Sequence, residues 1–199
     1  MTMMENYWKV TKQFPNKENQ EVVNEFLLSL KLANRSSRTI KAYKFFLEMF
    51  FYDMEEVYYS LSSKAIYEWL MKDHDRIKER TFRNRLSILS GFYKFCIKEE
   101  YIEHSPIKRR WNPRMPMPIP KYLEKKEIAK IRQQVEKKSL RDQVLIEFML
   151  TTGCRVAEVN QLNRKDVDLE TRTARIVGKG KKSDMFILQT NVQFSLKNI

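Results

Sequence analysis

The sequence predicts a mainly α protein of two folded pieces, the second an α+β piece with a short β-hairpin. Apolar residues recur at spacings of three and four through most of residues 19–98, which is typical of helices packed on a core. Five of the six prolines lie between Pro106 and Pro120, which favours an extended connector. Beyond residue 173, two apolar runs flank a Gly-Lys-Gly turn, a pattern that indicates a hairpin.

Composition and charge limit the classes of function. The 199 residues include 38 Lys and Arg against 25 Asp and Glu, and the net charge of +13 indicates a polyanionic partner, either nucleic acid or an anionic membrane surface. The 42% hydrophobic content supports a real core and excludes wholesale disorder. Two cysteines form no disulfide framework, and no run approaches the roughly 18 apolar residues of a membrane span. We therefore expect a soluble, cytoplasmic protein without a signal peptide or membrane contact.

Four helices are predicted in the first piece, residues 1–105. They cover residues 19–33, a stretch near 38–50 capped by Ser37, a stretch capped by Ser62 or Ser63, and a stretch near 79–98. The positions predicted to face inward are Val22, Val23, Phe26, Leu27, Leu30, Ile40, Tyr43, Leu47, Phe50, Ile66, Trp69, Leu70, Phe82, Leu86, Leu89, Tyr93 and Cys96.

Basic residues gather on two of these helices. The second helix carries Arg38, Lys41 and Lys44 at three-residue spacing, and the fourth carries Arg80, Arg83 and Arg85 in its first turns. A run of charges is usually a solvated helix face, and contact with phosphate groups is the alternative. The residues alone leave both interpretations open.

A basic, proline-rich linker at residues 106–121 leads to a mixed second piece at residues 122–199. Its predicted helix at 140–150 is strongly apolar and ends at Gly153, the natural left-handed terminator. The other predicted elements are helices at 123–135 and from Arg155 to about Leu162, and strands at 174–177 and 185–188.

The most specific motif lies in the second piece. It reads Thr152-Gly153-Cys154-Arg155-Val156-Ala157-Glu158-Val159, and is followed by Leu162, Asp166 and Gly178-Lys179-Gly180. This resembles the first half of the catalytic domain of the tyrosine recombinases, the phage integrase family. Upstream, Thr39-Ile40-x-x-Tyr43 and Arg85-Leu86-Ser87-x-Leu89-x-x-Phe92-Tyr93 resemble the family's SAM-like helical core-binding domain. The resemblance covers about residues 18–188.

The resemblance implies site-specific recombination and integration of double-stranded DNA, without a metal or other cofactor and with a tyrosine nucleophile. Arg155 would bind the non-bridging phosphate oxygens, Lys179 would protonate the leaving 5′-oxygen, and Glu158 would orient Arg155. The two basic stripes, together with Lys181 and Lys182 of the hairpin, would contact the DNA backbone.

The chain departs from the family pattern after the hairpin. The family's later motifs are a His-x-x-Arg segment, a second His or Trp and the tyrosine, whereas both histidines and all nine tyrosines here precede Arg155. We therefore expect a truncated catalytic domain that binds DNA and cannot cleave it alone. Apolar side chains of helix 140–150 would stay uncovered, which favours a homo-oligomer or assembly with a full-length recombinase on DNA.

Three alternatives remain open. The chain could be a non-catalytic regulator that competes with a full-length recombinase, or the product of a decayed or frame-shifted gene. A helix-turn-helix transcription factor is the third, and it would leave the spacing from Arg155 to Lys179 unexplained.

Overall fold

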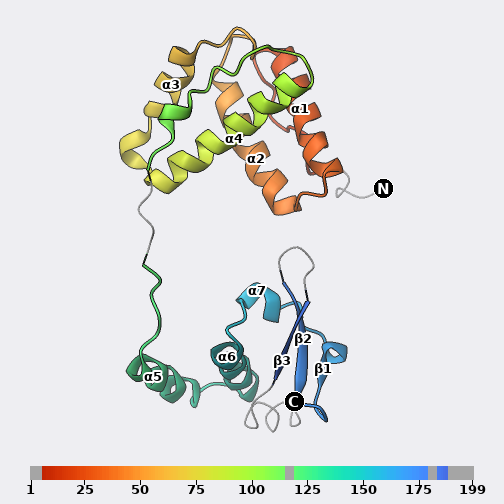
Figure 1. Cartoon of the computed structure of the whole chain (residues 1–199), viewed down its shortest axis with the longest axis vertical. Helices are drawn as coiled ribbons and strands as arrows, with labels where there is room; N and C mark the ends of the chain where they lie inside the picture. The colour runs from red at the N-terminus through yellow and green to blue at the C-terminus, as the bar shows by residue number, and fades with distance from the viewer. Residues whose placement is uncertain (1–5, 115–118, 179–182, 188–199) are drawn as a thin grey trace. The chain divides into compact units, whose positions relative to one another are not determined.

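The computed structural model describes residues 6–114, 119–178 and 183–187. They form two compact units, Met1–Pro118 and Ile119–Ile199, each with its own hydrophobic core (Figure 1). The fold class predicted from the sequence is confirmed, since the first unit is helical and the second combines helices with a small sheet. No helix in the described ranges has both the length and the hydropathy that a bilayer crossing requires.

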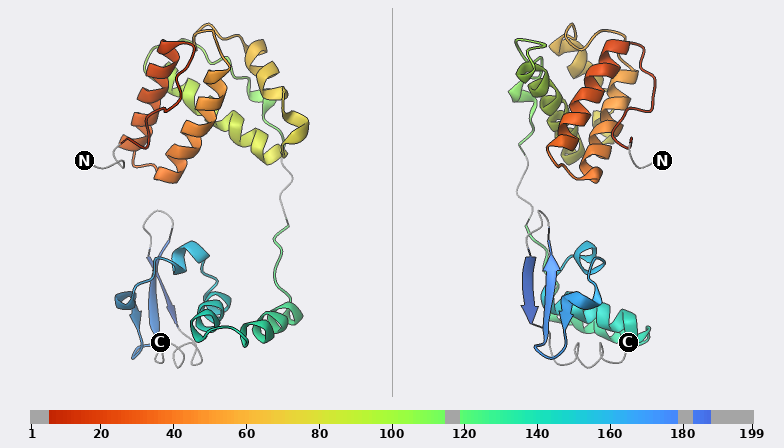
Figure 2. Two further views of the ribbon diagram at one scale, coloured as in Figure 1. Left: turned by 180° about the vertical axis from the view of Figure 1, so that it is seen from behind. Right: turned by 90° about the vertical axis from the view of Figure 1, so that its right-hand side faces the viewer.

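The four helices predicted in the first unit are present, and the three whose bounds were predicted end within two residues of those bounds. In Figures 1 and 2, α1 and α2 lie side by side and α4 packs across both. The elements are α1 (Lys17–Leu32), α2 (Ser37–Tyr52), α3 (Ser63–Met71), the 3₁₀ helix η1 (His74–Arg76), α4 (Glu79–Lys98) and the 3₁₀ helix η2 (Arg109–Trp111).

The core of the first unit is built largely from aromatic rings. The ring of Phe26 in α1 contacts those of Phe92 and Phe95 in α4 at centroid distances of 5.7 and 5.4 Å. Such edge-to-face and tilted contacts add to the stabilisation that burial of the rings provides. All the predicted inward positions are buried except Leu30 and Tyr43, which pack half-buried at the edge of this core.

The N-cap of α2 is Ser36, not Ser37 as the sequence suggested. The Ser36 hydroxyl accepts a hydrogen bond from the Thr39 amide at 3.2 Å, and Ser36 has ψ 145°, outside the helical range. Ser37 is the first helical residue. Two adjacent serines offer the same capping chemistry, so only the backbone turn decides between them.

Gly91 lies where α4 approaches α2. A β-carbon at this position would meet the Tyr43 ring at 3.7 Å, an ordinary van der Waals contact. Because alanine loses less backbone entropy than glycine in a helix interior, Gly91→Ala should raise the unfolding free energy by about 0.5–1 kcal/mol. Urea unfolding monitored by tryptophan fluorescence measures this, and a destabilised variant would show that α2 and α4 cannot accept the methyl group.

Two irregular segments pack on the helical unit. The N-terminal segment is held through Thr11, whose amide and hydroxyl donate hydrogen bonds to the buried Glu48 carboxylate of α2. Near the other end of the unit, the Ser63 hydroxyl donates to the Pro106 carbonyl at 2.7 Å, and the side chains of Ile107 and Trp111 pack on the core. Residues 106–111, which the sequence places in the linker, therefore contact the first unit because their apolar side chains find a surface there.

The second unit places helices on one face of a small antiparallel sheet (Figure 2). Its core is formed by α6 and α7 against β2, through Val144, Phe148, Val159, Ala174 and Ile176. The sheet order is β1-β2-β3. The elements are α5 (Lys125–Val135), α6 (Leu140–Thr152), α7 (Val156–Val159), the 3₁₀ helix η3 (Arg164–Asp166), β1 (Val167–Asp168), β2 (Thr173–Val177) and β3 (Ser183–Ile187).

Two features of the second unit differ from the sequence prediction. Helix α7 is shorter than the predicted 155–162, because the amides of Gln161 and Leu162 bond to carbonyls three residues back and tighten the chain into turns. Strand β1 was not predicted, since two residues are too short for a periodic signal. On α6 only Val144 and Phe148 are buried, and Leu140 and Leu145 are exposed.

Candidate active site and nucleic-acid interface

The turn between α6 and α7 sets the position of Arg155. Gly153 ends α6 in the left-handed conformation, with φ 68°, and its amide bonds to the Met149 carbonyl at 2.9 Å. The Thr152 hydroxyl donates to the Phe148 carbonyl at 2.6 Å and accepts from the Cys154 amide at 3.3 Å. The Thr-Gly pair thereby fixes both sides of the turn, and Arg155 follows as the N-cap residue of α7.

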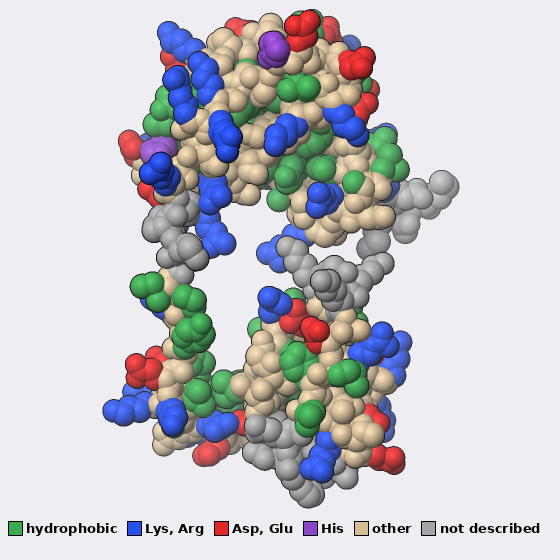
Figure 3. All heavy atoms as spheres, in the orientation of Figure 1, with side chains coloured by type: hydrophobic (Ala, Val, Ile, Leu, Met, Phe, Trp, Pro, Cys, Tyr) green, Lys and Arg blue, Asp and Glu red, His purple; other side chains and the backbone are tan. Residues whose placement is uncertain are grey.

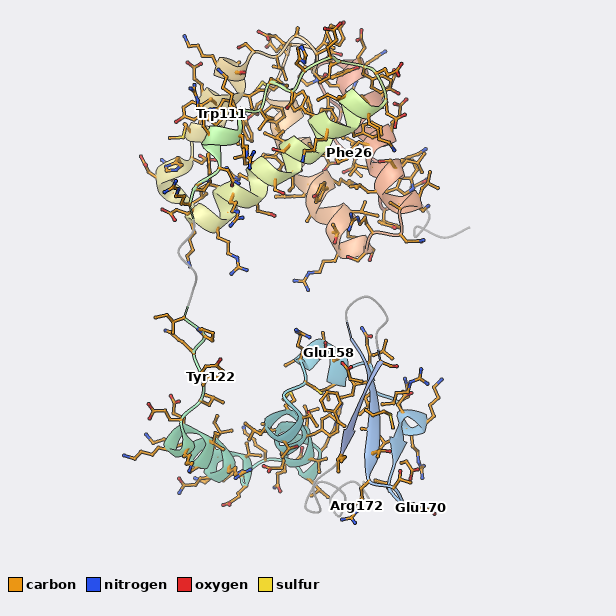
Figure 4. All side chains as sticks on the ribbon, viewed as in Figure 1. Phe26, Trp111, Tyr122, Glu158, Glu170 and Arg172 are labelled. Atoms are coloured by element: carbon orange, nitrogen blue, oxygen red, sulfur yellow. The ribbon has the colours of Figure 1, made fainter. Side chains whose placement is uncertain are left out.

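Glu158 holds Arg155 at two points. The Arg155 amide donates to one carboxylate oxygen of Glu158 at 2.9 Å, and Arg155 Nη1 donates to the other at 2.7 Å (Figure 4). The Arg155 side chain remains 79% exposed, whereas that of Glu158 is 14% exposed. A guanidinium has five N–H donors, so most of them are free to bind an anion while the carboxylate fixes the direction of the side chain.

The Glu158 carboxyl should titrate below its ordinary range. The pKa of this carboxyl lies below the ordinary glutamate value of 4.5. The larger cause is the hydrogen bond from the Arg155 amide, and the hydrogen bond from the Arg155 side chain adds to it. The pair therefore contributes stability above pH 4.5, and this contribution is lost as the pH falls through the lowered pKa. Carboxyl-carbon NMR titration should show one low glutamate pKa that is absent in Glu158→Gln. An ordinary pKa at Glu158 would contradict the pairing.

Lys179, Lys181 and Lys182 fall outside the described residues. The flanking strands are defined up to the pairing of Val177 with Ser183, so β2 and β3 bracket these lysines in the chain. The sequence prediction of a hairpin with strands on either side of Lys179 agrees with this register.

The stripe predicted on α2 divides into two parts. Arg38 and Lys41 are exposed, and Phe45 on the same face is 71% exposed, at spacings of three and four residues. The Lys44 side chain is only 14% exposed, and its Nζ lies 3.9 Å from a Glu48 carboxylate oxygen. The structure therefore brings Arg38 and Lys41 together at the surface and places Lys44 in an ion pair.

The cations predicted on α4 also differ in exposure. Arg80 and Arg83 are exposed, whereas the Arg85 side chain is mostly covered and lies 3.9 Å from Asp73. Arg83 and Arg80 are therefore the residues of this set whose side chains are exposed.

A groove runs along α4, and most of its lining residues were not predicted from the sequence. We call this the α4 groove. One wall carries Arg83, Ser87, Ser90 and Lys94 at spacings of four, three and four residues, and Lys108, Arg109 and Asn112 line the other wall. Among the residues that the structure describes, no acidic side chain lines it. Lys and Arg side chains gather over α4 in Figure 3. The spacing of hydrogen-bond donors from Arg83 to Lys94 was the signal available in the sequence.

The described residues contain no group of three or more His, Cys, Asp or Glu side chains arranged to hold a metal ion.

Comparison with known proteins assigns both units. The phage integrase family profile matches residues 121–199, and the profile of the phage integrase N-terminal SAM-like domain matches residues 23–100. The chain belongs to the phage integrase family.

Curated relatives of this phage integrase family member are tyrosine recombinases. The chain is 31% identical to tyrosine recombinase XerC of Chlamydia trachomatis serovar L2 over 139 residues, which cover 66% of this chain and 43% of that protein. It is 36% identical to XerC of Bacillus subtilis over 109 residues, covering 53% of this chain and 36% of that protein. The chain thus spans less than half the length of these relatives.

Solved structures of integrases and recombinases share the fold. A lambda integrase (75–356) dimer bound to a COC' core site matches with a TM-score of 0.72 at 15% identity, covering 89% of this chain and 65% of that one. The XerH site-specific recombinase bound to a palindromic difH substrate matches with a TM-score of 0.61 at 20% identity, covering 96% and 62%. At these identities the likeness establishes the fold of the phage integrase family member.

Proposed function

We propose that this chain is the DNA-binding and phosphate-activating part of a tyrosine recombinase that acts in site-specific recombination and integration. The observation that carries the proposal is the α4 groove, in which arginine, lysine and serine donors line both walls without an acidic side chain. Cations and hydroxyl groups are the side chains that contact phosphate in DNA complexes. Solved relatives of the same fold are bound to DNA, which supports double-stranded DNA as the partner.

In the proposed complex the duplex backbone lies along the α4 groove and the exposed face of α2. Arg83, Lys94 and Arg109 contact phosphates, and Arg80, Arg38 and Lys41 extend the contact. Phe45 projects from the α2 face, where an apolar ring suits contact with a thymine methyl group. Phosphate contacts set the register, while such base contacts supply sequence preference.

Arg155 is the proposed phosphate clamp of the second unit. Its exposed guanidinium can bind the non-bridging oxygens of a scissile phosphate as negative charge builds on them. Glu158 acts as a positioning residue, since it binds both the amide and the side chain of Arg155. Lys179 is the proposed general acid for the leaving 5′-oxygen, and Lys181 and Lys182 add backbone contacts.

The 199 residues by themselves are proposed to bind DNA without cleaving it. The last tyrosine is Tyr122, which precedes Arg155, and neither histidine is followed by arginine three residues later. Without a tyrosine nucleophile in the matching position, Arg155 and Lys179 have no covalent step to promote. A nicked substrate that traps phosphotyrosine adducts should therefore yield none with this chain.

The salt dependence of duplex binding tests the proposal. If five to eight phosphates are neutralised, log K should fall with log salt at a slope of roughly −5 to −7. Fluorescence anisotropy with a labelled duplex measures this between 50 and 300 mM salt (roughly the range in which counterion release dominates). An affinity that does not change with salt would contradict binding through phosphate contacts. A covalent adduct on the nicked substrate would contradict the proposal that these 199 residues do not cleave DNA.

A second candidate is a regulator that occupies recombination sites, alone, as a homo-oligomer, or beside a full-length recombinase. The observation that favours it is the donor-lined α4 groove of the helical unit, which can bind DNA without a catalytic tyrosine. Such a regulator should compete with a full-length relative for the same inverted-repeat DNA. Equal competition by unrelated duplexes would argue against it.

A further inference from the structure

The first unit has a second groove, which the proposed function does not use. It lies between α3, the start of α4 and η2, and we call it the Trp111 groove. Its aromatic lining comes from Tyr67, Phe82 and Trp111, and its cations are Lys64, Lys108 and Arg110. Figure 4 shows Trp111 on the segment that follows α4, beside α3. Lys108 also lines the α4 groove, so the two grooves meet at this residue.

The aromatic side chains leave ring surface open to a ligand. The rings of Tyr67 and Trp111 have centroids 5.2 Å apart and planes tilted by 43°, so they are not stacked in parallel. Tyr67 is 40% exposed, and Trp111 is half-buried. A flat ring bound here could lie against one or both faces.

The charges around these rings favour an anion. Among the described residues, neither Lys108 nor Arg110 has an acidic partner within ion-pair distance, and Lys64 lies 3.8 Å from Glu68. Within the described part of the chain, Glu79 is the acidic residue that lines the groove. A ligand that combines flat rings with regularly spaced negative charges therefore fits both the aromatic and the cationic side chains of the groove.

We propose that the Trp111 groove binds unpaired nucleotides of DNA, with bases stacked on Tyr67 and Trp111 and phosphates held by Lys108 and Arg110. This proposal rests on the proposed DNA-binding function. In a duplex, the faces of each base are covered by the neighbouring base pairs. An aromatic side chain can therefore stack on a base only where the strand is unpaired. Because Lys108 lines both grooves, a single strand that leaves a duplex on the α4 groove enters the Trp111 groove directly.

The test compares two single strands that carry equal charge. One is a ten-nucleotide oligothymidylate (about the site size of a single-strand-binding module), and the other is an abasic strand with the same number of phosphates. Wild-type protein should bind the oligothymidylate about tenfold more tightly than the abasic strand, since stacking contributes a factor of this order for each base. Tyr67→Ser should reduce this preference several-fold, with Trp111 left as the remaining ring for stacking. Tyr52→Ser, which alters an exposed tyrosine of α2, should keep it.

A second measurement follows the groove without relying on affinity. Tryptophan emission should be quenched when oligothymidylate is added. Trp111→Phe should remove most of the quenching, because Trp69 is buried and Trp8 does not line the Trp111 groove. Unchanged thermal unfolding of each variant shows that the helical unit is intact. An unchanged preference for oligothymidylate in Tyr67→Ser, or equal weakening of single-strand and duplex binding, would overturn the inference. Failure of the wild-type protein to bind duplex would instead overturn the proposed function, since the preference between the two single strands is measured separately.

Discussion

Replacing Arg83, Lys94 and Arg109 together with alanine is expected to weaken duplex DNA binding by about two orders of magnitude at about 0.1 M salt. The three cations line the α4 groove, two of them from α4 and one from η2. Each phosphate contact adds about 0.9 to the magnitude of the slope of log K against log salt. One contact therefore strengthens binding roughly eightfold when the salt concentration falls from about 1 M to about 0.1 M. The remaining donors of the groove reduce the combined loss. The slope itself should become shallower by about 2.7.

The matched control removes the same charge elsewhere on the same unit. Lys17, Lys72 and Lys98 are exposed, line neither groove and make no ion pair among the described residues. Replacing these three with alanine should change the affinity less than threefold (about the effect of altered long-range attraction alone). Equal losses in the two triple variants would show that overall charge, rather than the α4 groove, determines DNA binding.

The sequence predicted the elements that have a strong period and the residues that face inward from them. The bounds of α4 were predicted as 79–98, and Phe82, Leu86 and Cys96 are buried as expected. Helix periodicity is a local property, so a single chain is enough to reveal it. The Thr152-Gly153 turn and its left-handed glycine were likewise readable, because a helix terminator has a local chemical cause.

The features that sequence reasoning missed depend on contacts between distant parts of the chain. Lys44 is part of a regular basic stripe, and only its pairing with Glu48, together with the N-terminal segment docked nearby, removes it from the exposed face. The second wall of the α4 groove comes from Lys108 and Arg109, which lie within the segment predicted to be a linker. Proline content predicts an extended backbone, and it carries no information about the surface on which that backbone lies.

Replacing Glu48 with alanine is expected to lower the unfolding free energy of the helical unit by about 3 kcal/mol. The Glu48 carboxylate is buried and accepts from the Thr11 amide, the Thr11 hydroxyl at 2.9 Å and the Lys12 amide at 3.4 Å. Its loss leaves backbone donors without a partner and leaves the mostly covered Lys44 ammonium without its counter-charge. Glu48→Gln keeps an acceptor oxygen, so it should cost about half as much.

Tryptophan fluorescence isolates this effect in the full chain. All three tryptophans, Trp8, Trp69 and Trp111, lie in the unit Met1–Pro118, so urea unfolding followed by their emission reports that unit alone. Glu21→Ala is the control, because Glu21 is exposed on α1 and makes no side-chain hydrogen bond or ion pair among the described residues. It should change the unfolding free energy by less than about 0.5 kcal/mol.

Hydrogen exchange and DNA binding separate the role of Glu48 in folding from a role in recognition. If Glu48 holds the N-terminal segment, the amide hydrogen of Thr11 should exchange faster in Glu48→Ala than in the wild-type protein. Amide hydrogens in the middle of α4 should remain protected from exchange at low denaturant. Duplex affinity should not decrease, because the substitution removes a negative charge and frees Lys44. A variant that keeps wild-type stability and protection at Thr11 would show that the segment is held by its apolar contacts, with Phe14 as the buried anchor.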